Sequence, residues 1–242
     1  MDHLLVIRAE DSPTDLTQPR GKQDWLEQPH NIWYPRTTGI WQPAWLEPVP
    51  ATYITHLQWT SDLDNGLLGF ALSLQRRYAT PVDVRVTLSL QGTPVADATY
   101  VTHDADLGGA VALSRSRTTW LGGDLLWEPE HPTLLDATIT VSDGGTVIDR
   151  VDSYVGLRSI AIEDGRFLLN GRPYYLRLAL EQGYWPTSHL AAPSAEALRR
   201  EVELAKEFGF NGVRIHQKVE DPRFLYWCDR LERHSSNHPP KN

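Results

Sequence analysis

The sequence predicts a multidomain fold in which antiparallel β-structure is followed by an α/β segment. Up to about residue 155, short β-prone runs alternate with turn signals, and residues 82–90 alternate strictly between apolar and polar side chains. Beyond residue 155, strand-like and helix-like segments alternate, which is typical of a parallel sheet with crossover helices. These two patterns divide the chain of 242 residues into a β part and an α/β part.

Residues 56–155 predict one immunoglobulin-like β-sandwich. The region has about 100 residues, the usual size of such a domain, and it carries several short strands separated by turns. Asp143-Gly144-Gly145 separates two β-prone runs and predicts a hairpin. The strands are expected near residues 52–59, 67–74, 82–90, 137–141 and 146–151.

Residues 1–55 have a different character. The stretch from Glu10 to Gln28 is polar and contains Pro13, Pro19 and Gly21, and the β-prone runs 32–34 and 39–46 follow it. A segment this short cannot bury a core of its own. We therefore interpret it as the C-terminal part of a larger β-sandwich, a partial jelly roll.

Residues 156–231 predict the beginning of a (β/α)8 TIM barrel. Ser194 and Asp221 are good N-cap residues for two helices, each preceded by a strand-like run. A complete barrel has eight such units, so two units make an incomplete one. A polar tail, 232–242, is expected to contain no third strand. The expected elements are a strand over 174–180, a linker over 181–193, a helix from 195 to about 208, a strand over 212–216 and a helix over 222–231.

Composition excludes several classes of function. The formal net charge is −8 and the basic residues are scattered, so nucleic acid is not expected as a partner. No apolar stretch is long enough to span a bilayer, and the N-terminus lacks the pattern of a signal peptide, so we expect a soluble, cytoplasmic protein. The single cysteine, Cys228, forms no internal disulfide, and no metal site or cofactor-binding glycine loop is expected.

Four stretches carry a recognisable pattern: Thr38–Glu47, Leu126–Leu135, Gly156–Ile160 with Phe167–Pro173, and Gly209–His216. In this order they resemble glycoside hydrolase family 2. The first is similar to the closing strand of that family's galactose-binding-like sandwich, and the second to the tryptophan–proline signature of its immunoglobulin-like domain. In the second stretch, Leu135 stands where the family usually has Tyr. The third is similar to the entry of the barrel and the fourth to its second strand.

This resemblance implies a retaining β-glycosidase that hydrolyses O-glycosyl bonds of a β-glycoside. The mechanism needs two carboxyl groups, and in the family both are glutamates from later barrel strands. No residue of this chain is therefore assigned a catalytic role, and the chain alone is expected to be inactive. The sugar and the linkage stay open.

Five residues are candidates for contacts with a carbohydrate substrate in the full-length context. Arg214 and His216 lie on the second predicted barrel strand, and the resemblance places the arginine near the nucleophile. Glu181 follows the first strand, and Tyr184 and Trp185 lie in the long linker after it, a kind of loop that often carries function. Each has a structural alternative: the arginine pairing with a buried carboxylate, or the aromatic rings packing against a neighbouring domain.

Other interpretations of the chain remain. One alternative is a non-catalytic carbohydrate-binding or interaction module that uses the sandwich. Another is a gene fragment with no function of its own. A further alternative is complementation by a second polypeptide bearing the remaining strands.

Overall fold

The computed structural model describes residues 4–12, 15, 17–113 and 125–231. The chain divides into two compact units. We call residues 47–175 the sandwich unit, and residues 1–46 together with 176–242 the strand–helix unit. The polar tail expected over 232–242 lies outside the described residues.

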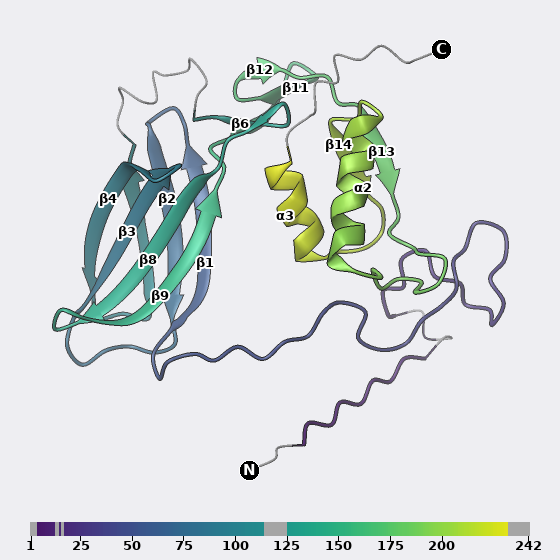
Figure 1. Ribbon diagram of the computed structural model, residues 1–242, viewed down its shortest axis with the longest axis horizontal. Helices are drawn as coiled ribbons and strands as arrows, with labels where there is room; N and C mark the ends of the chain where they lie inside the picture. The colour runs from purple at the N-terminus through teal and green to yellow at the C-terminus, as the bar shows by residue number, and fades with distance from the viewer. Residues whose placement is uncertain (1–3, 13–14, 16, 114–124, 232–242) are drawn as a thin grey trace. The chain divides into compact units, whose positions relative to one another are not determined.

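The sandwich unit contains two antiparallel sheets, which Figure 1 shows in blue and teal. One has the strand order β1-β2-β5 and the other β4-β3-β8-β9. The strands predicted over 67–74 and 82–90 are confirmed residue for residue. The bounds are β1 Ile54–Asp62, β2 Leu67–Leu74, β3 Val82–Leu90, β4 Thr93–Thr102, β5 Asp106–Ala112, β8 Leu135–Asp143 and β9 Thr146–Val155.

The core of this unit lies between the two sheets. Alternate residues of β3 are buried while those between them are exposed or half-buried, because successive side chains of a strand point to opposite faces. Strand β8 has the same alternation, and β2 contributes a row of apolar side chains from the other sheet. The fully buried side chains include Leu68, Val84, Val86, Leu135 and Ile139.

Shorter strands complete the unit: β6 Trp127–Glu128, β7 His131–Pro132, β10 Ile160–Glu163, β11 Arg166–Leu169 and β12 Arg172–Pro173. Asn170, in the turn between β11 and β12, joins them to β6 by donating its side-chain amide to the carbonyl of Trp127 at 3.1 Å. Its Oδ1 accepts the backbone N–H of Ser159 at 3.0 Å.

The strand–helix unit contains one parallel pair of strands. β13 Leu178–Glu181 and β14 Gly212–Ile215 pair in register, with Leu178 opposite Gly212 and Glu181 opposite Ile215. The strand predicted over 174–180 therefore begins four residues late, and residues 174–177 are not in a strand. The backbone N–H of Tyr174 instead donates to the carbonyl of Phe167 at 3.0 Å, and ladder pairing with β14 begins only at Leu178.

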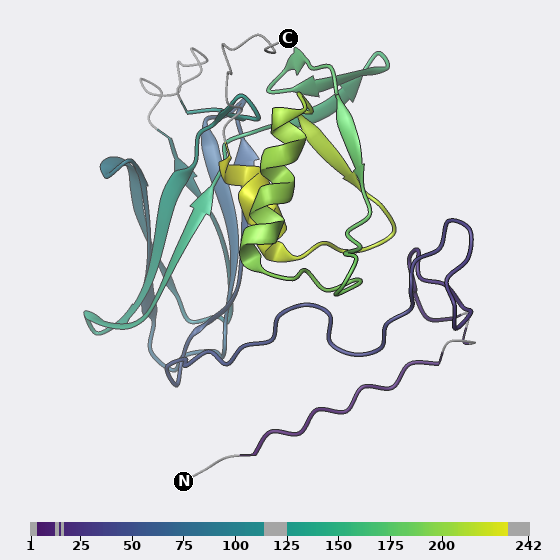
Figure 2. The ribbon, with the colours of Figure 1, turned by 45° about the vertical axis from the view of Figure 1, so that its right-hand side comes forward.

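Two helices accompany this pair, and both views show α2 alongside the strands (Figure 2). α2 Ala195–Glu207 begins where Ser194 accepts the backbone N–H of Ala197 at 3.1 Å. α3 Pro222–Arg230 begins where Asp221 accepts the N–H of Arg223 at 2.8 Å. Both predicted caps are confirmed. The buried face of the helices consists of Leu198, Val202 and Phe224.

The N-terminal part of this unit is not a sheet. The described residues up to 53 form turns and extended chain, with one isolated bridge between Gln23 and Tyr34. The strands of a partial jelly roll predicted for 1–55 are therefore not formed within the described residues. A strand is stable only when its backbone groups pair with a neighbour, and no described strand lies beside this segment to supply that pairing.

Candidate functional site

The carboxyl ends of β13 and β14 lie side by side and carry most of the candidate residues. The backbone N–H of His216 donates to the carbonyl of Glu181 at 3.0 Å, which holds the two strand ends together. Because Glu181 is paired with Ile215, its side chain lies on the same face of the pair as Val213, which packs against α2 and α3. Arg214 is paired with Leu180 and lies on the opposite face. The sheet thus separates Glu181 from Arg214.

Arg214 is exposed and His216 is half-buried beyond the end of β14. The opposite face of the strand pair, where Arg214 lies, also carries Leu178 and Leu180, which are exposed within the described residues. An arginine here can bind a carboxylate or a sugar hydroxyl through its fork of N–H donors. Because it lies on the opposite face, Arg214 does not neutralise the buried Glu181.

Tyr184 and Trp185 lie in the loop after β13 but in different surroundings. The ring of Tyr184 stacks on that of Tyr34, with centroids 4.1 Å apart and planes within 4° of parallel. Burial raises the pKa of the Tyr184 phenol. Trp185 packs against the cluster of Leu198, Val202 and Phe224, and its backbone pairs with His189. Tyr184 therefore contacts the N-terminal segment, while Trp185 anchors the loop to the helices.

A buried charge cluster lies at the ends of the two strands. The ammonium of Lys218 forms an ion pair with Glu220 and stands 3.6 Å from Oε1 of Glu181. The side chains of all three are less than one-tenth exposed. Glu220 also accepts the backbone N–H of Asp221 at 2.8 Å. One cation is thus shared by two buried carboxyl groups.

Gly183 makes room for this cluster. Its backbone lies in the left-handed region with φ 62°, which glycine adopts without strain. A Cβ built at this position would lie 1.4 Å from the Lys218 nitrogen and 2.8 Å from Oε1 of Glu181. The ammonium group therefore occupies the space that any other residue would need for its side chain.

The charge cluster predicts a pH dependence of stability. Burial, together with the neighbouring Glu220, raises the pKa of Glu181 from 4.5 to about 8. The folded protein therefore holds a proton that the unfolded chain releases, and this stabilisation is complete below about pH 4.5 and lost as the pH rises towards 8. In the parent chain, the free energy of unfolding measured with urea should fall by on the order of a few kcal/mol between pH 5 and pH 8. We expect this fall to be absent in Glu181→Gln. Equal pH slopes for both proteins would contradict it.

The described residues include neither a reactive thiol nor a metal-binding group of side chains. Burial raises the pKa of Cys228 to about 12, so this thiol stays protonated and is a poor nucleophile. No group of three or more His, Cys, Asp and Glu side chains within the described ranges is arranged to hold a metal ion. None of the described helices is long and apolar enough to cross a bilayer.

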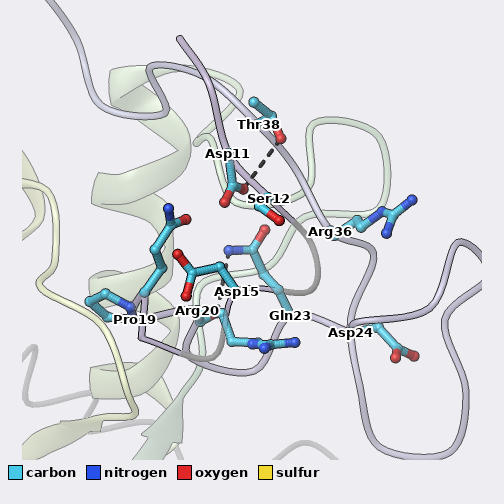
Figure 3. A pocket seen from close by; sticks show the side chains of 10 residues that line it. Asp11, Ser12, Asp15, Pro19, Arg20, Gln23, Asp24, Arg36 and Thr38 are labelled. Carbon is cyan, nitrogen blue, oxygen red and sulfur yellow. Dashed lines mark hydrogen bonds between the residues drawn. The ribbon is translucent and has the colours of Figure 1, made fainter.

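A concavity of about 260 Å³ lies in the N-terminal segment of the strand–helix unit (Figure 3). Its charged side chains are three aspartates and two arginines, and the aspartates already accept hydrogen bonds from the segment itself. Asp11 accepts from Thr38, and Asp24 accepts from Leu26 and His30. The lining charges stabilise the loop. The lining residues are Asp11, Ser12, Asp15, Gln18, Pro19, Arg20, Gln23, Asp24, Arg36 and Thr38.

Sequence reasoning placed Glu181 and Glu220 after neighbouring strands but missed Lys218 and the buried grouping of the three. Lys218 and Glu220 lie in a short charged stretch after β14, which has the composition of a solvent-exposed loop. Tyr34 was missed because it is 150 positions from Tyr184 in the sequence. The one available signal was Gly183, two residues beyond the end of β13, since a glycine near a strand often marks a close approach of other atoms.

Comparison with known proteins supports a family assignment. The model of the family "Glycosyl hydrolases family 2" matches residues 52–158, which cover most of the sandwich unit. A β-galactosidase of Bacteroides ovatus is 29% identical over 222 residues, which are 86% of this chain and 25% of that protein. The chain thus spans about a quarter of the length of this curated relative.

Solved structures have the same fold. A glycosyl hydrolase family 2 member from Bacteroides cellulosilyticus matches with a TM-score of 0.63 and 20% identity, over 75% of this chain and 24% of that chain. The β-glucuronidase of Ruminococcus gnavus matches with a TM-score of 0.59 and 22% identity, over 74% of this chain and 28% of that chain. The family match, the relative and the shared fold agree: the chain is similar to glycosyl hydrolase family 2 over residues 52–158, and it corresponds to part of the length of these relatives.

Proposed function

We propose that this chain is part of a retaining β-glycosidase, which hydrolyses the O-glycosyl bond of a β-glycoside. The observation that carries the proposal is the parallel pair β13–β14 with its two helices, following a β-sandwich in a chain similar to this family. This order supports an immunoglobulin-like domain over 56–155 and the first βα units of a (β/α)8 barrel over 156–231. The similarity of residues 38–47 to a closing strand supports a place for 1–55 in a galactose-binding-like sandwich.

In this proposal Arg214 and His216 face the sugar. Barrel enzymes place their chemistry at the carboxyl ends of the strands, and both residues lie at or just beyond the end of β14. Tyr184, Trp185 and Glu181 border the same strand ends, where the loop after β13 begins. The exposure of Arg214, away from the buried Glu181, Lys218 and Glu220, supports a role toward substrate.

We further propose that the chain on its own does not hydrolyse glycosides. A retaining enzyme needs an acid and a nucleophile about 5–5.5 Å apart, flanking the scissile bond. The carboxyl groups that the two strand ends bring together, Glu181 and Glu220, are buried against Lys218, so they cannot flank a substrate.

The expected result is no turnover of nitrophenyl β-galactoside or nitrophenyl β-glucuronide by the purified chain, followed by absorbance of released nitrophenol. The two carboxyl groups at the strand ends, Glu181 and Glu220, are buried against Lys218, so the rate should equal that of buffer alone. Clear turnover that Arg214→Ala abolishes would refute this proposal.

A chimera tests the proposed lineage function directly. This chain would replace the matching segment of the Bacteroides ovatus β-galactosidase, and hydrolysis of nitrophenyl β-galactoside would be measured. We expect activity in the folded chimera and a loss of about 100-fold in kcat/KM on Arg214→Ala, because misplacing substrate by about 1 Å costs this much. Arg200→Ala, which removes an exposed arginine of α2, is the matched control and should keep its activity. A folded chimera without activity would argue against the proposed function.

A further inference from the structure

A cavity different from the one in the N-terminal segment lies beside α2, on the buried face of the strand pair, within the strand–helix unit. Its volume is about 370 Å³, which is in the range of sites for small molecules. The wall combines two carboxyl groups and an amide with aromatic rings. Its polar and aromatic lining includes Glu181, Gln182, Glu201, Tyr34, Tyr184 and Phe208.

The hydrogen-bonding groups at this cavity are acceptors that lack donors. Both carboxyl oxygens of Glu181 and the side-chain oxygen of Gln182 are buried, and none accepts a hydrogen bond from the described residues. Glu181 is 7% exposed. A buried acceptor without a donor is energetically unfavourable, and more so if it is charged. A ligand that fits here must bring N–H or O–H donors.

The charge balance around the cavity favours a cation. Three carboxyl groups, Glu181, Glu201 and Glu220, gather around the single ammonium of Lys218, and that ammonium is closest to Glu220. Glu181 and Glu201 line the cavity, whereas Lys218 does not. Burial raises the pKa of both carboxyl groups, that of Glu181 to about 8, so Glu181 holds a proton at neutral pH where a second positive charge would stabilise its carboxylate. The other titratable groups nearby are Tyr34, Tyr184 and Cys228.

We propose that this cavity binds a small organic ammonium of about the size of a sugar ring, with its charged nitrogen paired to Glu181 and Glu201. The body of the ligand lies against Tyr34, Tyr184 and Phe208, since aromatic rings pack well on the apolar faces of small rings and attract cations. On binding at neutral pH, Glu181 gives its proton to solvent and the ammonium replaces it as the partner of the carboxylate. This site does not use Arg214, the main substrate contact of the proposed hydrolysis, which lies on the opposite face of the strands.

Calorimetry on the whole chain with D-glucosamine and D-glucose tests the proposal. The two sugars have the same ring and differ in one position, an ammonium in place of a hydroxyl. We expect glucosamine to bind at least about tenfold more tightly, because the paired charge is partly desolvated. In two buffers of different ionisation enthalpy, the heats should differ by the release of up to one proton. Glucose binding as tightly as glucosamine, or no binding of glucosamine, would overturn the proposal.

Variants locate the site. Glu181→Gln and Glu201→Gln should each lose the preference for glucosamine and the released proton, provided that circular dichroism shows a folded protein. Glu201 is only half-buried, so Glu201→Gln should disturb folding less and still tests the site if Glu181→Gln fails to fold. Glu203→Gln on the same helix, where the carboxylate pairs with Arg199 in solvent, should bind as the parent chain does. Equal loss in Glu203→Gln, or full binding in Glu201→Gln, would overturn the assignment.

Discussion

Lys218→Met is expected to lower the free energy of unfolding of the strand–helix unit by about 3–5 kcal/mol at pH 8, the cost of removing one partner from a buried ion pair. Methionine keeps most of the length of the side chain but leaves Glu181 and Glu220 without a cation. The measurement is hydrogen exchange of α2 and α3 peptides by mass spectrometry, which reports the opening of this unit separately.

The size of this loss should depend on pH. At pH 5 Glu181 is protonated in either protein, because burial raises its pKa to about 8, so the missing cation matters less. Arg200→Met, which removes an exposed cation paired with Glu207 at 2.6 Å, is the control and should cost less than about 1 kcal/mol. An equal loss at pH 5 and pH 8 would show that Lys218 acts by packing alone.

Leu68→Ala is expected to destabilise the sandwich unit by about 2–5 kcal/mol. Leu68 has no exposed surface and lies in β2, between the two sheets. Truncation removes buried hydrocarbon and leaves a cavity that β-strands fixed by their ladders fill poorly. Denaturant unfolding followed by circular dichroism of the β-sheet signal measures the change.

A matched control comes from the exposed side of the same unit. Val101 in β4 is 65% exposed, so Val101→Ala should change stability by only about 0.5 kcal/mol. Similar losses for the two variants would mean that Leu68 does not lie in a packed core.

The sequence predicted the bounds of β3 residue for residue, because the burial of this strand alternates. Val82–Leu90 was found because its valines and leucines occupy every second position and face one core. Strand β5 was missed because Gly108-Gly109 reads as a turn. A Cβ at Gly109 would lie 2.6 Å from the ring of Phe70 and 2.9 Å from that of Tyr100, so this glycine admits two aromatic rings to the sheet surface. Only the neighbouring strands reveal that requirement.

The candidate site was predictable in its position but not in its grouping. The βαβα order placed Glu181, Arg214 and His216 at neighbouring strand ends, as found. Whether two residues share a face depends on the pairing register, which the sequence of either strand alone does not contain. The recruitment of Lys218 into the interior depends on the absence of a side chain at Gly183, a relation between positions 35 residues apart.

The close approach of Lys218 to Gly183 constrains how positions 183 and 218 can vary together in evolution. A side chain at 183, even that of asparagine, which tolerates a left-handed backbone, cannot coexist with the long lysine at 218. Homologues that lose the glycine should also carry a shorter residue at 218 and a neutral one at 181, so the three sites should exchange as a set. An alignment in which the glycine varies freely while the lysine is retained would indicate a different backbone path in those homologues.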